Sequence, residues 1–329
     1  MTRFLVAPDS FKGTFSASEV AAAIGEGVRD AGAEADLCPV ADGGDGTLQA
    51  LLDALGGESV AAKVHDPLGR EIQAAFGLLG AGDTAIVEMA QASGLHLVAP
   101  VDRDAEAAST IGTGELIAAA YARGARRIVV TVGGSATTDG GTGAISAIEA
   151  AGGIAGATVV CLCDVTTEFE RAAEVFAPQK GADAAAVGRL TGRLHGQAEA
   201  FPRDPRGVPR TGAAGGLSGA LWAYFGAELS SGADWVLDAV GFDERLRQVD
   251  GVITGEGRLD RQTFEGKLVG TVAERVHRAS IPLHAVVGSS ELSSEERDQL
   301  SLASITEATD VAQMRAAGSA IATAPLRGS

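Results

Sequence analysis

The sequence of 329 residues is poor in aromatic residues, cysteine and lysine, and it contains no asparagine. Aromatic side chains make up only 4% of it, whereas hydrophobic residues reach 46%. A core with so few aromatic rings has to be built from Ala, Val, Leu and Ile, which is typical of helices that cover a parallel sheet. The composition therefore disfavours an all-β sandwich.

Disulfides and long apolar runs are also lacking. Three cysteines are too few for a disulfide framework, so we expect free thiols in a reducing compartment. The first apolar run, residues 4–8, is too short for the core of a signal peptide. The longest run without charge, residues 211–227, is short of the roughly 20 residues that span a bilayer. We expect a soluble, cytoplasmic protein.

Basic residues are outnumbered, since 26 Lys and Arg face 43 Asp and Glu, which gives a net charge of −17. A surface this negative repels the phosphates of nucleic acids and anionic lipids, so we expect neither a nucleic-acid nor a membrane partner. Arginine fills 22 of the basic positions, and the only lysines are Lys12, Lys63, Lys180 and Lys267.

Strand-like and helix-like segments alternate along the chain. The periodicity predicts strands at 4–8, 36–40, 84–90, 127–132, 159–165, 249–254 and 282–287, and a β-hairpin around the turn 66–70. It predicts helices at 17–30, 47–55, 114–123, 142–151 and 184–200, the first one headed by the capping box Ser16–Glu19. The predicted fold class is α/β. A doubly wound Rossmann-like domain (1–62 and 240–329) would carry an inserted mixed α/β domain (63–239).

Glycine, in contrast, is abundant: 45 residues, about twice the usual share. Four glycine-rich segments follow predicted strands, at 9–13, 42–46, 133–143 and 255–260. In open α/β sheets, ligands bind beyond the carboxyl ends of the strands, where glycine lets backbone N–H groups approach an anion. Any one of these loops is explained equally well by a tight turn and a helix cap. Four such loops, each with a carboxylate, favour a binding site.

The loop carboxylates indicate a cation, because carboxylates repel phosphates. These residues are Asp42, Asp45, Asp139, Glu256 and Asp260. Mg²⁺ is usually held by one or two carboxylates together with substrate phosphates. One of the carboxylates would alternatively accept the proton of an attacking hydroxyl, and Asp42 and Asp139 are also candidates for helix N-caps.

Three of the four lysines, Lys12, Lys180 and Lys267, lie next to glycines in short motifs of this kind: SFKG, PQKG and GK. A compact ammonium group can follow a phosphoryl group through its transfer, although surface lysines with no function are the alternative. The P-loop, the protein-kinase elements and the dinucleotide fingerprint are absent from the sequence. The pattern indicates phosphoryl transfer by another type of site.

These segments resemble those of the bacterial glycerate kinase family. The matching stretches are APDSFKG (7–13), PVADGGDGT (39–47), DPLGR (66–70), GTGELI (112–117), GGSAT (133–137), DGG (139–141), CDV (163–165), PQKGA (178–182), GAAGG (212–216), TGEG (254–257), Asp260 and GK (266–267). They occur in the order of the family and cover nearly the whole chain. Thr138, where the family usually has Asn, and the short segment 166–171 depart from its pattern.

The resemblance implies the transfer of a phosphoryl group from ATP, with Mg²⁺, to D-glycerate. The expected product is 2-phosphoglycerate, with 3-phosphoglycerate as the alternative. The resemblance also implies two α/β domains with the site in the cleft between them. A non-catalytic sensor of a phosphorylated metabolite and a sugar-phosphate isomerase are the rival functions, and a monomer or homodimer is expected.

The site hypothesis combines the loops, the carboxylates and the lysines. The candidate catalytic residues are Asp9, Lys12, Asp42, Asp139 and Lys180. The candidate ATP-binding residues are Ser10, Gly43, Gly44, Gly133, Gly134, Ser135, Gly255 and Glu256. Arg258 and Lys267 are expected to bind the glycerate carboxylate, and Asp45, Glu256 and Asp260 are expected to hold Mg²⁺.

Overall fold

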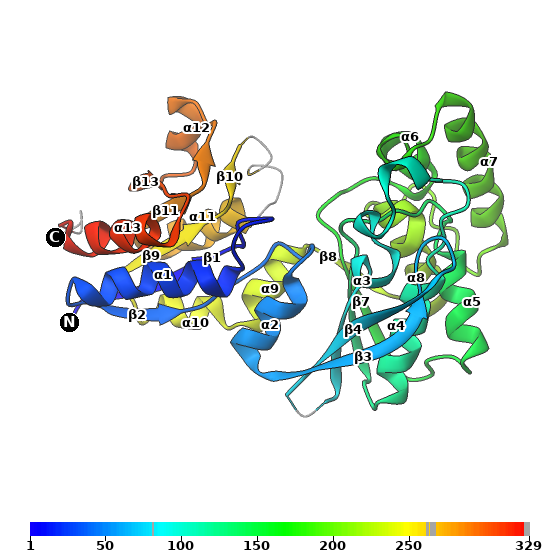
Figure 1. Cartoon of the computed structure of the whole chain (residues 1–329), viewed down its shortest axis with the longest axis horizontal. Coiled ribbons are helices and arrows are strands. Elements are labelled where there is room, and N and C mark those ends of the chain that lie inside the picture. Colours follow the sequence, from blue (N-terminus) through cyan, green and yellow to red (C-terminus); the bar gives the residue numbers. More distant parts are fainter. Residues whose placement is uncertain (81, 261–262, 264–267, 326–329) are drawn as a thin grey trace. The chain divides into compact units, whose positions relative to one another are not determined.

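The computed structural model of the chain describes residues 1–80, 82–260, 263 and 268–325 (Figure 1). Its contacts divide the chain into two compact units. Unit 1 comprises the described residues of 1–42, 49–54 and 233–329, and unit 2 comprises those of 43–48 and 55–232. The boundaries expected from the sequence lie elsewhere, at 62/63 and 239/240. Residues 57–62 belong to unit 2 because strand β3 (Gly57–His65) pairs with β4 (Glu71–Leu79) over its whole length.

Unit 1 is built on a parallel sheet of five strands in the order β13-β11-β9-β1-β2. The strands are β1 (Arg3–Pro8), β2 (Glu34–Leu37), β9 (Gly251–Gly255), β11 (Leu283–Val287) and β13 (Ser304–Glu307). Numbered in chain order, the strands follow the doubly wound order 2-1-3-4-5, so the chain reverses its direction of winding between β1 and β9. The doubly wound prediction is confirmed.

The first helix of unit 1, α1 (Ala17–Asp30), begins as its sequence predicts. The Ser16 side chain accepts from the Glu19 N–H, and the Glu19 side chain accepts from the Ser16 N–H. Helix α1 lies beside α13 (Val311–Thr323), and both cover one face of the sheet through Phe4, Val6 and Ile253. Because crossovers between parallel strands are right-handed, the connection from β9 to β11 places α11 (Leu268–Ala279) on the other face. Helix α2 (Thr47–Leu55) has its middle in unit 1 and both its ends in unit 2, and α9 (Gly232–Ala239) lies in unit 1 after its first residue. Unit 1 also contains α10 (Phe242–Leu246), α12 (Ser294–Gln299) and the two-stranded sheet of β10 (Arg258–Leu259) and β12 (Ser289–Ser290).

Unit 2 contains a mixed sheet in the order β3-β4-β5-β6-β7-β8. The hairpin of β3 and β4 and the next strand, β5 (Thr84–Glu88), are antiparallel. From β5 onward the strands β6 (Arg127–Thr131), β7 (Thr158–Leu162) and β8 (Glu228–Ser230) are parallel. The inserted mixed α/β domain is thus confirmed as a fold, with the predicted hairpin at its edge.

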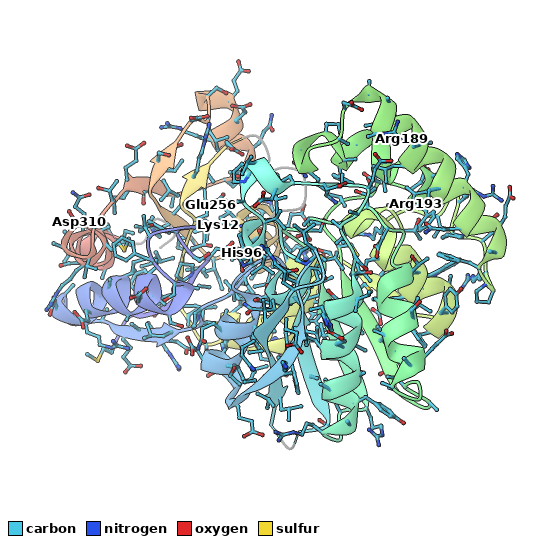
Figure 2. All side chains as sticks on the ribbon, turned by 45° about the vertical axis from the view of Figure 1, so that its right-hand side comes forward. Lys12, His96, Arg189, Arg193, Glu256 and Asp310 are labelled. Carbon is cyan, nitrogen blue, oxygen red and sulfur yellow. The ribbon has the colours of Figure 1, made fainter. Side chains whose placement is uncertain are left out.

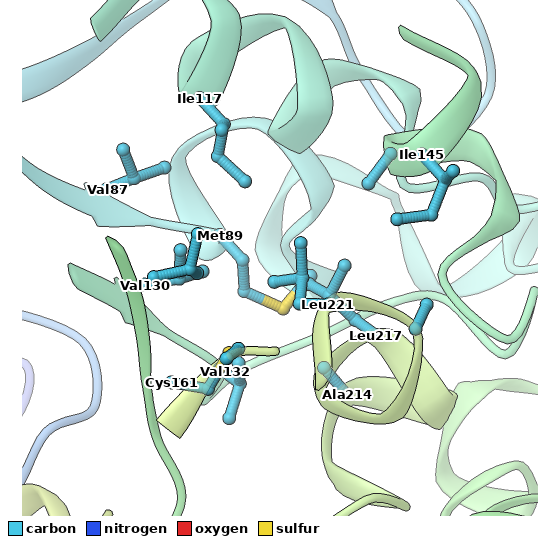
Figure 3. Close-up of a cluster of buried hydrophobic side chains, with 14 of the residues drawn as sticks. Val87, Met89, Ile117, Val130, Val132, Ile145, Cys161, Ala214, Leu217 and Leu221 are labelled. Carbon is cyan, nitrogen blue, oxygen red and sulfur yellow. The ribbon is translucent and has the colours of Figure 1, made fainter. Parts of the chain in front are cut away.

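The helices of unit 2 enclose an aliphatic core. Figure 3 shows Met89, which is fully buried, among side chains of the sheet such as Val87 and Val130 and of helices such as Ile117 and Leu221. The helical elements of the unit are α3 (Ala90–Ser93), α4 (Ile111–Ala122), α5 (Thr142–Ala150), α6 (Ala172–Phe176), α7 (Ala184–Ala200), α8 (Leu217–Phe225) and the 3₁₀ helices η1 (Leu95–Leu97), η2 (Pro100–Asp102), η3 (Phe169–Arg171), η4 (Pro178–Lys180) and η5 (Ala213–Gly216). In the part of the chain that the structure describes, no helix combines the length and the apolar character of a membrane span.

Candidate active site

A pocket of about 460 Å³ lies in unit 1 beyond the carboxyl ends of β1 and β9. These two strands are neighbours, with Pro8 opposite Gly255, and the winding of the chain reverses between them. In open α/β sheets this is the position where ligands bind. Seven residues selected from the sequence line the pocket together: Asp9, Ser10, Lys12, Asp42, Glu256, Arg258 and Asp260.

Asp9 is the most deeply buried acid of this group, with 6% of its surface exposed. Its backbone N–H donates to the Gly255 carbonyl at 2.8 Å, and its Oδ1 accepts from the Ser10 N–H at 2.6 Å. Burial raises the pKa of Asp9 to about 8, with the charge of Asp42 as the next cause and that of Glu256 adding to both. Lys12 and the Ser10 N–H oppose the rise in this pKa. Asp9 can therefore exchange a proton near neutral pH.

Lys12 projects from the tight loop between β1 and α1. Hydrogen bonds between the backbones of Phe11 and Phe15 close this loop, and Thr14 Oγ1 donates to the Phe11 carbonyl at 2.8 Å. Lys12 Nζ lies 3.1 Å from Asp42 Oδ2, and 63% of the lysine side chain is exposed. Figure 2 labels Lys12 and Glu256, which approach the same pocket from the loops after β1 and β9. The ammonium group can reach a ligand there.

The loop after β9 supplies further charged groups. Glu256 Oε1 accepts from Thr263 Oγ1 at 3.0 Å. Arg258 contacts two carboxylates, Glu291 at 2.6 Å and Asp260 at 3.6 Å. The predicted residue Lys267 lies outside the described residues.

Gly255 has a packing role. A Cβ atom at this position would lie 2.0 Å from the Val286 carbonyl oxygen of the neighbouring strand. Only glycine allows so close an approach of two backbones. The sequence predicted Gly255 as an ATP-binding residue. Its close packing accounts for the glycine without a ligand.

In unit 2 the structure brings two of the predicted glycine loops together. A Cβ on Gly133, just after β6, would lie 3.1 Å from Gly44 Cα, so the loop 43–46 packs directly on the loop 133–135. Gly133 and Ser135 are partly exposed and Gly134 is exposed, as expected for a loop that meets a ligand. Of the three acids predicted to hold Mg²⁺, Asp45 belongs to unit 2, whereas Glu256 and Asp260 belong to unit 1.

Glu88 is a buried acid that no motif of the sequence indicates. It ends β5, is 2% exposed, and accepts from the Leu48 N–H at 2.7 Å through Oε1. Burial raises its pKa, and the charge of Asp45 contributes to this rise. A glutamate directly after the apolar run Ala85–Val87 was the signal available in the sequence.

Lys180 lies beneath the loop 133–135 and not on the surface. Only 1% of it is exposed, and its Nζ donates to Ser135 Oγ at 2.9 Å and to the Thr137 carbonyl at 2.5 Å. Burial lowers the pKa of Lys180 to about 7, against the opposing effect of Asp139. The sequence predicted that Lys180 neutralises phosphates. The structure shows that it reaches the loop through Ser135.

Asp139, which is 7% exposed, connects the beginnings of two helices through hydrogen bonds of its carboxylate. Its Oδ2 accepts from the N–H and Oγ1 of Thr110, both at 2.8 Å, and from the Gly143 N–H at 3.3 Å, whereas its Oδ1 accepts from the Gly141 N–H at 3.0 Å. These bonds tie the beginning of α4 to that of α5. The N-cap of α5 is Gly141, so Asp139 stabilises this helix start without being its cap.

The fold and these loops define the class of the protein: an α/β protein with polar, glycine-rich loops at the carboxyl ends of its parallel strands. The model of the glycerate kinase family matches residues 4–152 and 148–325. The chain belongs to the glycerate kinase family.

The chain is similar to several proteins of known name. It is 39% identical over 327 residues to the glycerate 2-kinase of Escherichia coli K12, with 87% of this chain and 85% of the relative covered. It is 40% identical over 325 residues to the glycerate kinase of Bacillus subtilis 168, again with 87% and 85% covered. A crystal structure of a candidate glycerate kinase 2 from Salmonella typhimurium LT2 superposes with a TM-score of 0.86 at 34% identity, over 98% of this chain and 97% of the other.

The raised pKa of Asp9 predicts a pH-dependent stability. Between the ordinary carboxyl value of 3.8 and about 8, the folded protein keeps the Asp9 proton whereas the unfolded chain releases it. The free energy of unfolding should therefore fall as pH rises through this window, by up to about 1.4 kcal/mol per pH unit for this group. Urea unfolding at pH 5, 6.5 and 8 should show that Asp9→Asn removes this fall.

The control for this prediction is Glu34→Gln, which removes an exposed carboxylate on β2 of the same unit. It should leave the pH dependence as in the unchanged protein. If Asp9→Asn and Glu34→Gln give the same dependence on pH, the unusual environment of Asp9 is refuted.

Proposed function

We propose that this protein is a glycerate kinase that transfers the γ-phosphoryl group of ATP to D-glycerate. Its membership of the family supports this activity. The observation that carries the proposal is the unit 1 pocket, where the buried Asp9 lies with Lys12 at the winding reversal of a parallel sheet. The name of the Escherichia coli relative, glycerate 2-kinase, supports 2-phosphoglycerate as the product over 3-phosphoglycerate.

Asp9 is the proposed general base. The attacking glycerate hydroxyl forms a bond to the γ-phosphorus, the bond from this phosphorus to the ADP oxygen breaks, and the hydroxyl proton passes to the Asp9 carboxylate. A base works best when its pKa lies near the working pH. The raised pKa of Asp9, about 8, meets that requirement better than an ordinary aspartate would.

Lys12 is proposed to stabilise the phosphoryl group during transfer. Phosphoryl transfer depends on positioning and on charge stabilisation. The Lys12 ammonium group is exposed, and its loop is closed by backbone bonds on both sides of it. Asp42, 3.1 Å away, holds the lysine at the pocket. A negatively charged ligand would compete with Asp42 for the ammonium group.

Glu256 and Asp260 are the proposed protein ligands of Mg²⁺. No cluster of three or more His, Cys, Asp or Glu side chains that could hold a metal ion occurs among the described residues. Mg²⁺ needs only one or two carboxylates when phosphates complete its shell, so the pocket fits the ion. The negative charge of Glu256 and Asp42, which raises the pKa of Asp9, also favours a cation. When bound, Mg²⁺ neutralises charge that develops on the transferred phosphate.

Arg258 is the proposed partner of the glycerate carboxylate. It lines the same pocket, and its side chain is 61% exposed. Glu291 and Asp260 already contact its guanidinium group, which leaves N–H donors for one further carboxylate. The same contacts hold the side chain at the rim of the pocket.

A sensor of a phosphorylated metabolite is the rival function from another class. A sensor needs no general base, and a carboxylate buried beside two others would only weaken the binding of an anion. A sugar-phosphate isomerase would use a base but would release no ADP. Neither rival has support from the family that the chain matches.

The test of the function is ADP release with Mg²⁺ and a panel of hydroxy acids. D-Glycerate should stimulate ADP formation, and phosphorus NMR should show the phosphate on the 2-hydroxyl. A sensor would bind the nucleotide without releasing ADP. If glycerate fails to stimulate ADP formation while other acceptors do so, the substrate assignment is wrong.

Replacement of Lys12 should affect turnover specifically. We expect Lys12→Ala to lower kcat by about 100-fold or more, because one donor to the developing charge is typically worth this factor. The matched control is Lys63→Ala, which removes an exposed lysine whose Nζ lies 2.6 Å from Glu71 on the hairpin of unit 2. Steady-state kinetics should show unchanged turnover for the control. Equal turnover of the two variants would contradict the role of Lys12.

A further inference from the structure

We propose that the backbone N–H groups of Gly134 and Ser135 and the Ser135 hydroxyl form a phosphate-binding site in unit 2, and that Lys180 is its buried positioning residue. The site would take a phosphate group, either free or as part of a nucleotide. The identification of this nucleotide as ATP rests on the proposed function. The binding of a phosphate group is inferred from the loop alone and does not depend on the proposed function.

The backbone of the loop leaves donors free for a ligand. Gly94 and Ser135 form an antiparallel bridge, in which Leu95 N–H donates to the Gly134 carbonyl and Ala136 N–H donates to the Ser93 carbonyl. In such a bridge the N–H of Ser135 itself points away from Gly94. Among the hydrogen bonds of the described residues, neither the Gly134 N–H nor the Ser135 N–H is a donor.

Gly134 makes the turn that exposes these groups. Its φ of +70° is a left-handed conformation, which favours glycine. Successive N–H groups around a left-handed residue form a concave site for anions. Gly134 is exposed and Ser135 is partly exposed, so a phosphate group can approach both.

Lys180 sets the direction of the Ser135 hydroxyl. Its Nζ donates to Ser135 Oγ at 2.9 Å and is held in place by the Thr137 carbonyl at 2.5 Å. Because the lysine donates to this oxygen, the hydroxyl hydrogen must point elsewhere. The hydroxyl is then a third donor for a ligand on the exposed side of the loop.

The charge of Lys180 also points to an anion. Burying an ammonium group is costly unless an anion compensates it. Within the described parts of the chain, no carboxylate lies within 4.0 Å of its Nζ, and the charge of Asp139 acts from farther away. The oxygens of Asp139 are engaged with the N–H groups of Thr110, Gly141 and Gly143. A phosphate on Ser135 would supply the missing counter-charge.

Binding of inorganic phosphate and of ADP, measured by isothermal titration calorimetry at pH 6.5, tests the site. Ser135→Ala removes one oxygen atom and should weaken the binding of both by about 10-fold, the effect of a single good hydrogen bond. Ser135→Thr, which restores the hydroxyl, should recover most of the affinity. The control is Ser146→Ala, an exposed serine on α5 whose replacement should change nothing.

The indirect role of Lys180 is tested by a double-mutant cycle. Lys180→Met should weaken the binding of ADP, raise the KM for ATP and leave the KM for glycerate unchanged. In the Ser135→Ala background it should have a clearly smaller effect, because it acts partly through the hydroxyl. In the unchanged protein, affinity should fall as pH rises through about 7, where Lys180 loses its proton; the other charged groups near it are Asp139 and Arg103.

Two results would overturn the proposal: unchanged phosphate and ADP affinity in Ser135→Ala, or fully additive effects of the two replacements. The affinity change in Ser135→Ala decides the proposal even if Lys180→Met fails to fold. Because the measured quantity is binding without glycerate, failure of this site is distinct from failure of the glycerate kinase assignment, which is measured by ADP release.

Discussion

The candidate sites of this molecule depend on one physical constraint: ionisable groups are buried at the carboxyl ends of parallel strands. Asp9 is packed between the ends of β1 and β9, and Lys180 lies beneath the loop that follows β6. Strands of this kind are covered on both faces, so their polar chemistry gathers at the loops. Each of these groups is costly to hold in its charged form without a partner. In the absence of a ligand, the packing of the two cores has to offset the free-energy cost of burying these groups. A ligand of opposite charge would reduce that cost.

The two units carry opposite charges at these positions. In unit 1, Asp42 and Glu256 increase the negative charge around Asp9, and the exposed Lys12 lies at the edge of the same pocket. This negatively charged pocket favours the binding of a cation and of a hydroxyl group that can give its proton to Asp9. In unit 2, the positive charge lies below the surface and reaches the loop through the Ser135 hydroxyl. We propose accordingly that unit 1 provides the base and Lys12, and that the loop of unit 2 binds a phosphate group.

The sequence predicted which residues line the pocket of unit 1 better than it predicted the environment of each residue. Strand periods and glycine loops located the pocket of unit 1, because the residues after β1 and β9 are recognisable locally. The raised pKa of Asp9 was not predictable, since it depends on burial and on the charges of Asp42 and Glu256, which are distant in the chain. The burial of Lys180 and the bonds of Asp139 to Thr110 also come from distant segments. Glu88 was missed because a single acid after an apolar strand has no motif.

The four lysines of this chain make one measurement especially direct. In the protein labelled with ¹³C at the lysine side chains, Lys180 should titrate near pH 7, far below its ordinary value of 10.5. Addition of ADP should raise this pKa, because a bound phosphate favours the charged ammonium group. A titration of Lys180 near pH 10.5 would contradict the effect of burial on this lysine. A pKa that ADP leaves unchanged would contradict the claim that a bound phosphate supplies its counter-charge.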